Sequence, residues 1–127
     1  MAERPRFAPH PLRWVVEPLM AEPTYVERPL FGAQGCYLHG RLVLVLCSRD
    51  EEPWQGLLVP TEKHHHQGLR RELPALGVHP VLRKWLYLGE ALPEAFEETA
   101  LGLVDLIRRS DPRIGATSAS RRRTHLT

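Results

Sequence analysis

The stretch LFGAQGCYLHGRLVLVLCS, residues 30–48, decides the fold of this chain. It consists of two apolar runs separated by His39 and Gly40. A two-residue loop that ends in glycine is typical of the type I′ turn of a β-hairpin, because glycine adopts a positive φ angle at no steric cost. We therefore predict two antiparallel strands that meet at this turn. The predicted register pairs Leu38 with Arg41, Tyr37 with Leu42, Cys36 with Val43 and Gly35 with Leu44.

The second strand of this hairpin, residues 42–47, is apolar at every position. A strand with one face in water alternates apolar and polar residues, so an uninterrupted apolar run indicates that both faces are covered. One layer of helices can cover one face. We expect either further helices or a second subunit to cover the other face, and we therefore predict a homodimer.

The two cysteines are placed by the same register. Cys36 and Cys47 are expected on one face of the hairpin, four residue pairs and roughly 13 Å apart. A disulfide requires Cα atoms within about 7 Å of each other. We therefore predict two free thiols, as is typical of a reducing cytoplasm.

The composition indicates one globular domain, since the chain has 127 residues, of which 43% are hydrophobic and 25% are charged. No run of about 18 apolar residues is present, so we expect no membrane span. The N-terminus lacks the apolar core of a signal peptide, which favours a cytoplasmic location. Arginine far outnumbers lysine and there are 12 prolines, which we interpret as the composition of a bacterial protein from a genome of high G+C content.

The net charge of +2 is unevenly distributed along the chain. Residues 111–127 contain four arginines and one acid, so residues 1–110 carry a net charge of −1. A nearly neutral domain makes a nucleic-acid partner unlikely, and Arg121–Arg123 at a flexible end supply only weak attraction. We predict a flexible arm over residues 1–10, a single α+β domain over 11–110 and a disordered basic tail over 111–127.

The elements outside the hairpin follow from apolar periodicity and from the positions of proline. In chain order we predict a helix over 11–17, a strand over 25–31, a strand over 55–59, a helix from the N-cap Thr61 to about residue 73, a strand over 81–88 and a long helix from Pro93 to Arg109. Pro29 restricts the strand over 25–31 to an edge of the sheet or a bulge. This order predicts an α+β fold with an antiparallel sheet of about five strands and helices mainly on one face.

The strand predicted over residues 81–88 presents two different faces. Leu82, Leu86 and Leu88 are expected to face the core, because alternate side chains of a strand share a face. Arg83, Trp85 and Tyr87 then form an aromatic face with a cation. Such a face suits either a partner-binding surface or a dimer contact.

Several of the residues in the hairpin resemble the signature of the TfoX N-terminal-like domain family. The matching positions are Phe31, Gly32, Gly35, Tyr37, Gly40 and Arg41. Leu30 and Ala33 stand where the family has methionine and a second glycine, and residues 48–78 depart from its pattern. The resemblance extends over residues 12–109 and includes the run Trp85–Leu88 and the final helix. It implies a secretion-chaperone-like α/β domain, found alone in many bacteria and beside a second domain in competence regulators.

The histidine run His64–His66 is a candidate metal site. Glu62 and His66 are spaced i, i+4 and therefore share one face of a helix, and Asp50, Glu51 and Glu52 precede them. Imidazole and carboxylate groups suit Zn²⁺ or Mn²⁺. We interpret the run as a solvated helix start that binds no metal, with the metal site as the alternative.

No set of residues in the sequence amounts to a catalytic site. Cys36 and His39 have an odd separation, which sends them to opposite faces of a strand and argues against a thiol–imidazole pair. The glycines of the hairpin lack the Gly-Lys-Ser/Thr sequence of a phosphate loop. We therefore expect a regulatory or protein-interaction domain without enzymatic activity or cofactor, with metal or small-ligand binding at His64–His66 as the alternative and weak nucleic-acid binding as the third hypothesis.

Overall fold

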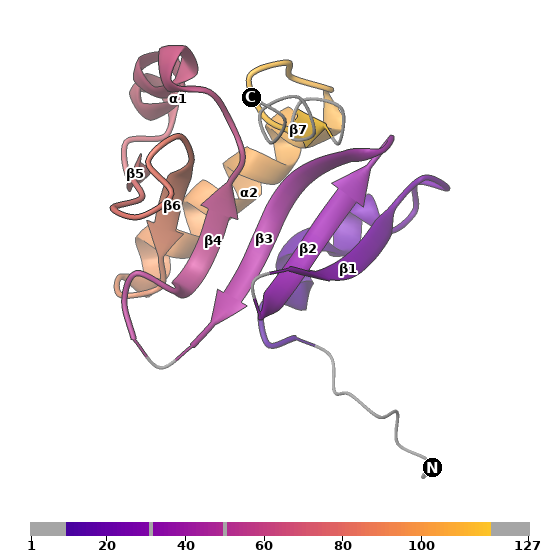
Figure 1. Ribbon diagram of the computed structural model, residues 1–127, viewed down its shortest axis with the longest axis horizontal. Helices are drawn as coiled ribbons and strands as arrows, with labels where there is room; N and C mark the ends of the chain where they lie inside the picture. The colour runs from indigo at the N-terminus through magenta and orange to yellow at the C-terminus, as the bar shows by residue number, and fades with distance from the viewer. Residues whose placement is uncertain (1–9, 31, 50, 118–127) are drawn as a thin grey trace, which may run out of the picture.

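An antiparallel β-sheet with helices against one face is the framework of the computed structural model (Figure 1). The structure describes residues 10–30, 32–49 and 51–117. The α+β fold class predicted from the sequence is confirmed. The strands are β1 (Val26–Leu30), β2 (Ala33–Leu38), β3 (Arg41–Ser48), β4 (Gln55–Val59), β5 (Gly77–Val78), β6 (Leu86–Gly89) and β7 (Ala116–Thr117). The helical elements are the 3-10 helices η1 (Arg13–Leu19) and η2 (Lys63–His65) and the α-helices α1 (His66–Glu72) and α2 (Pro93–Arg108).

The strands lie in the order β1-β2-β3-β4-β6-β5, with β7 paired to the start of β3. Of β3, only the second half, residues 45–48, pairs with β4. Residues 41–42 at the start of β3 pair with β7 instead. The predicted edge strand is confirmed as β1, where Pro29 is tolerated because one side of an edge strand needs no ladder hydrogen bonds. The sheet exceeds the expected five strands because two short strands, β5 and β7, join it.

The central hairpin turns at His39-Gly40, as the sequence predicts. Both residues have positive φ angles, 53° and 77°, which is the conformation of a type I′ turn. The predicted pairs next to the turn, Leu38 with Arg41 and Tyr37 with Leu42, are present. Beyond them the predicted register is wrong, because a β-bulge shifts it by one residue.

The bulge inserts Val43 as an extra residue, so that Cys36 pairs with Leu44 instead of Val43. Val43 and Leu44 consequently both contribute to the core beneath the helices, although they are adjacent in the chain. The shift also places Cys36 on the face toward the helices and Cys47 on the opposite face, which corrects the expectation that they share one. Both cysteines are buried free thiols.

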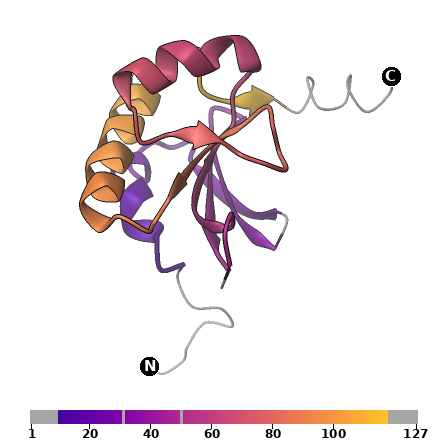
Figure 2. The same cartoon turned by 90° about the vertical axis from the view of Figure 1, so that its left-hand side faces the viewer.

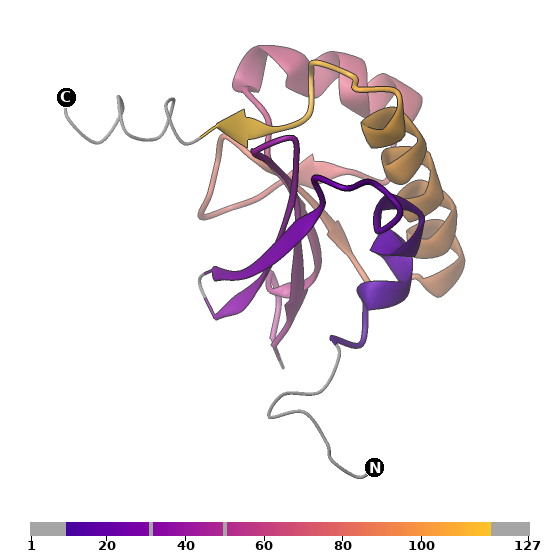
Figure 3. The ribbon, with the colours of Figure 1, turned by 90° about the vertical axis from the view of Figure 1, so that its right-hand side faces the viewer.

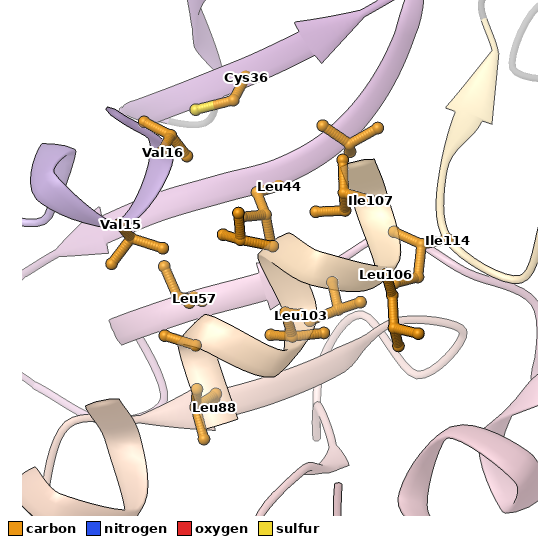
Figure 4. Close-up of a cluster of buried hydrophobic side chains, with 14 of the residues drawn as sticks. Val15, Val16, Cys36, Leu44, Leu57, Leu88, Leu103, Leu106, Ile107 and Ile114 are labelled. Carbon is orange, nitrogen blue, oxygen red and sulfur yellow. The ribbon is translucent and has the colours of Figure 1, made fainter. Parts of the chain in front are cut away.

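The main hydrophobic core lies between the sheet and the helices η1 and α2 (Figures 2 and 3). The predicted helix from Pro93 is α2, and proline suits its first turn because no intrahelical N–H is needed there. Its buried side chains meet those of β3, β4 and β6 in the core shown in Figure 4. The first helix is a 3-10 helix that buries Val15, Val16 and Leu19 and contains Pro18. Among the described residues, no helix is both long and apolar enough to cross a membrane.

The strand predicted over residues 81–88 is only half formed. Strand β6 begins at Leu86, and residues 79–85 form a loop closed by the hydrogen bonds from His79 N to Trp85 O and from Trp85 N to Leu82 O. Leu82 therefore does not face the helices as predicted. It packs on the opposite face of the sheet, because the turn at residues 82–85 breaks the alternation on which the prediction depended.

The C-terminal segment 111–117 belongs to the fold, although the sequence suggested a disordered tail from residue 111. Ile114 is 2% exposed, and Gly115 N donates a hydrogen bond to Pro60 O. Thr61, predicted to cap the second helix, instead donates its hydroxyl to Arg113 O, and η2 begins after Glu62 without a side-chain cap. The predicted arm 1–9 and the tail beyond Thr117, including Arg121–Arg123, lie outside the described residues.

Candidate functional site

The sheet face opposite the helices carries a second hydrophobic cluster, which we call the outer cluster. Its four buried members are Leu42, Val45, Cys47 and Leu58, and its half-buried members are Leu30, Ala33, Tyr37, Trp54, Leu82, Trp85 and Tyr87. Both faces of β3 are thus sheltered within one chain. Within the chain, the cover on this face is not a layer of helices. It consists of side chains from the 79–85 loop, which projects on the side of the sheet away from α2 (Figures 2 and 3), and from the β3–β4 loop.

The predicted surface residues Arg83, Trp85 and Tyr87 are divided by this arrangement. Trp85 and Tyr87 belong to the outer cluster, whereas Arg83 is exposed at the tip of the loop. The hydroxyl of Tyr87 donates to Glu52 Oε1 at 2.8 Å and accepts from Gln55 N at 2.8 Å. Burial, reinforced by Glu52, raises the pKa of Tyr87 above its usual value, so this hydroxyl is a fixed neutral hydrogen-bonding group.

Two arginines lie against the aromatic rings of the outer cluster. The guanidinium carbon of Arg49 is 4.9 Å from the ring centroid of Trp54, and that of Arg28 is 5.7 Å from the ring centroid of Tyr37. Both distances are within the range of a cation–π interaction. A partly exposed surface of tyrosine, tryptophan and arginine has the composition that is enriched in protein–protein interfaces.

His79 organises the loop that covers this face, and the sequence reasoning missed it. Its imidazole is fully buried, and its Nδ1 accepts hydrogen bonds from Val81 N at 3.1 Å and Leu82 N at 2.9 Å. Nε2 lies 3.0 Å from Pro53 O and donates to it, since Nδ1 is already the acceptor. Burial lowers the pKa of His79, although the bond to Pro53 opposes this.

The ring of His79 also connects the two loops that carry the aromatic residues. Its centroid is 4.6 Å from that of Trp54 and 5.4 Å from that of Tyr87. The sequence offers only one weak clue to this role. Residue 80 is a proline and has no N–H. The nearest backbone donors after His79 are therefore the N–H groups of Val81 and Leu82.

Glu62 and His66, the residues of the alternative metal hypothesis, both contact Lys84. Glu62 Oε2 lies 3.7 Å from Lys84 Nζ, and His66 Nε2 is hydrogen-bonded to Lys84 O at 2.8 Å. The acidic β3–β4 loop precedes β4 whereas the histidine run follows it, so they lie at opposite ends of that strand (Figure 1). Within the described ranges, no group of three or more His, Cys, Asp and Glu residues could hold a metal ion.

A polar cluster surrounds Glu27 beneath η1. Its carboxylate accepts hydrogen bonds from Tyr25 at 2.7 Å, Arg13 Nε at 3.1 Å and Gln34 Nε2 at 3.4 Å. Cys36 lies next to this cluster, but burial raises the pKa of its thiol to about 12. A protonated, inaccessible thiol is not a nucleophile, so this cluster serves as a structural network.

His39 and Cys47 complete the placement of the candidate chemical groups. His39 is exposed at the turn, where its Nδ1 lies 3.2 Å from Thr24 Oγ1, and it does not meet the buried Cys36. Burial raises the pKa of Cys47 to about 11. Neither cysteine is therefore an activated nucleophile.

The hairpin residues that resemble the family signature each have a different structural role. Phe31 lies outside the described residues. Gly32 and Gly40 have positive φ angles of 74° and 77°. Gly35 lies in the sheet where a Cβ atom would be 3.2 Å from Leu42 Cδ1 and 3.3 Å from Arg28 O. Tyr37 belongs to the outer cluster, and the partly buried Arg41 packs against the C-terminal segment.

Comparison with family models, with curated proteins and with solved structures finds no match for this chain. The fold and the site define its class: an α+β domain whose sheet is covered by helices on one face and presents arginine and aromatic side chains on the other.

Proposed function

We propose that this protein is a non-catalytic protein-interaction domain with a regulatory role in the bacterial cytoplasm, and that its outer cluster is the contact surface. The observation that carries this proposal is the combination of half-buried tryptophan and tyrosine rings with flanking arginines on one sheet face. The similarity of the hairpin to TfoX N-terminal-like domains is in keeping with a regulatory role.

We propose that the partner is a second copy of the chain. Leu42, Val45 and Leu58 are already buried within one chain, so the dimer contact would consist of the partly exposed rings and the 79–85 loop above them. Such a contact is smaller than one that buries a bare sheet face. We therefore expect a dimer that dissociates in the micromolar range rather than an obligate dimer.

Arg83→Glu tests this proposal, because Arg83 is exposed at the tip of the loop and the structure gives it no packing role. Arg108→Glu is the matched control, since it makes the same charge change at an exposed position of α2. Helix α2 covers the sheet face opposite the outer cluster. Sedimentation velocity over a range up to high micromolar concentration measures the dimer fraction.

We expect the wild-type chain and Arg108→Glu to dimerise equally and Arg83→Glu to dimerise at least tenfold more weakly. A wild-type chain that remains monomeric at high micromolar concentration would refute the homodimer. Equal loss of dimer in both variants would show that net charge matters and that the outer cluster is not the contact.

A further inference from the structure

A small cavity lies where the hairpin turn, the end of α2 and the C-terminal segment meet. Its floor is formed by four buried apolar side chains, and its polar lining consists of His39, Arg41, Ser110 and Asp111. The floor residues are Leu38, Val43, Ile107 and Ile114, of which Ile107 and Ile114 lie side by side in Figure 4. The cavity volume is about 50 Å³. One buried water needs about 10–15 Å³ of this measure, so there is room for about four water-sized groups.

Arg41 lies flat on the backbone of Gly115. A Cβ atom at residue 115 would be 2.6 Å from Arg41 Nη2 and 2.8 Å from Arg41 Cζ, so only glycine permits this approach. The guanidinium therefore lies against Gly115, and Arg41 lines the cavity. Its Nε is buried, and among the described residues it has no hydrogen-bond partner.

No carboxylate in the described part of the chain forms an ion pair with Arg41. Asp111 also lines the cavity, but both of its oxygens accept hydrogen bonds from Arg113, at 3.0 Å and 2.8 Å. Arg113 additionally pairs with Glu72 at 2.9 Å. A buried N–H without an acceptor, such as Arg41 Nε, costs stability, and native proteins rarely retain one without a reason.

Ser110 supplies a second unusual feature at the same cavity. It follows the C-cap of α2 with a φ of 59°, a position that glycine or asparagine usually occupies. Ser110 N donates to Ile107 O, and Ser110 is exposed and lines the same cavity as Arg41. A residue with a side-chain hydroxyl thus occupies a costly backbone conformation at the edge of this cavity.

We propose that this cavity binds the carboxylate group of a small aliphatic acid, with Arg41 as its charge partner. The planar guanidinium donates to the carboxylate oxygens in the paired geometry that suits these two groups, and the aliphatic group lies on the apolar floor. A singly charged carboxylate matches the charge of Arg41, which no described carboxylate neutralises. A phosphate dianion does not, because Asp111 is close and ionised, its pKa being lowered by the hydrogen bonds from Arg113.

The test is a titration of the full chain labelled with ¹⁵N, in which the Nε–H resonance of Arg41 is followed. Sodium acetate is the probe, acetamide is its neutral counterpart of the same shape, and sodium phosphate is the competing oxyanion, all at constant ionic strength. We expect a saturable shift with acetate, half-complete on the order of 1 mM for a ligand of this size, and none with acetamide. Saturation with phosphate but not acetate would overturn the carboxylate assignment. A shift that stays linear, or equal shifts with acetate and acetamide, would overturn the site.

Variants separate the ligand role of Arg41 from a structural role. In Arg41→Gln we expect acetate, followed by the backbone amide resonances of His39 and Ser110, to bind at least tenfold more weakly. Arg71→Gln, which removes a charge from the exposed surface of α1, should leave acetate binding unchanged. Arg41→Met, measured without acetate, should melt at or above the wild-type temperature, because it removes an unsatisfied donor. A clearly lower melting temperature for Arg41→Met would show that Arg41 stabilises the fold and would overturn the proposal.

Discussion

The substitution His79→Ala gives the sharpest test of how the outer cluster is held. The imidazole accepts from two backbone N–H groups and donates to one carbonyl, and it is fully buried between Trp54 and Tyr87. Each buried group left unpaired costs about 1–3 kcal/mol, but the loop can partly open to water. Together with the lost ring packing, we expect His79→Ala to destabilise the protein by about 3–5 kcal/mol.

The same residue predicts a specific pH dependence. Protonation of Nδ1 would remove its acceptor lone pair, and burial lowers the pKa of His79 below its ordinary value of 6.5. The unfolded chain therefore binds a proton at higher pH than the folded chain does. The contribution of His79 to the free energy of unfolding is complete above pH 6.5 and decreases below it, by up to about 1.4 kcal/mol per pH unit, until the folded pKa is reached.

Urea denaturation at pH 5, 6, 7 and 8 measures both effects, with tryptophan fluorescence as the probe, since Trp54 adjoins the ring. His39→Ala is the matched control, because His39 is exposed on the turn and should change stability by less than about 1 kcal/mol. His10 also has a pKa lowered by burial, so the background variant His10→Gln separates its contribution. A loss below 1 kcal/mol in His79→Ala, or an unchanged pH slope, would refute the role assigned to this ring.

Three further predictions concern close approaches and the thiols. Gly115 has a φ of 128°, a backbone conformation that strains alanine, and the flexible guanidinium of Arg41 would have to move away from the added Cβ atom. Gly115→Ala should therefore destabilise the protein by about 1–3 kcal/mol in urea denaturation. Gly40→Ala, with a φ of 77° and open space around its Cβ atom, should cost about 1 kcal/mol. Gly56→Ala should destabilise the protein more than Gly115→Ala, because its Cβ atom would overlap Leu88 O and separate β4 from β6. Soluble expression with a native circular dichroism spectrum and wild-type stability would contradict this prediction. Both cysteines should react with a thiol reagent at least a hundredfold more slowly in the native protein than in urea, since both are buried and protonated, and fast reaction of either would show that the sheet opens there.

Local interactions made part of the fold predictable. The turn at His39-Gly40 depends on the conformations of two adjacent residues, and α2 depends on a 3.6-residue apolar pattern that begins at Pro93. The bulge at Val43 was not predictable, because residues 42–47 are all apolar and either register would bury apolar side chains on both faces of the strand. Which of its side chains face the helices is decided by packing on both sides of the sheet.

The candidate site was predictable only in its residue types. The pattern at Trp85 and Tyr87 indicated an aromatic face, and the structure places both residues on one face. The same pattern misassigned Leu82, because a strand alternation cannot reveal that His79 bends residues 79–85 into a loop. The metal hypothesis failed to assemble a ligand set among the described residues, because Glu62 and His66 contact Lys84 instead.

By itself the sequence determined the hairpin, the final helix, the apolar character of both faces of β3 and hence the α+β class, since each of these follows from neighbours within a few residues. Only the tertiary structure decided what covers the second face and where Arg41 lies. Those features join residues that are far apart in the chain, such as His79 with Pro53 and Arg41 with Gly115. Such contacts arise from packing and from the pairing of buried polar groups, which leave no periodic pattern in the sequence.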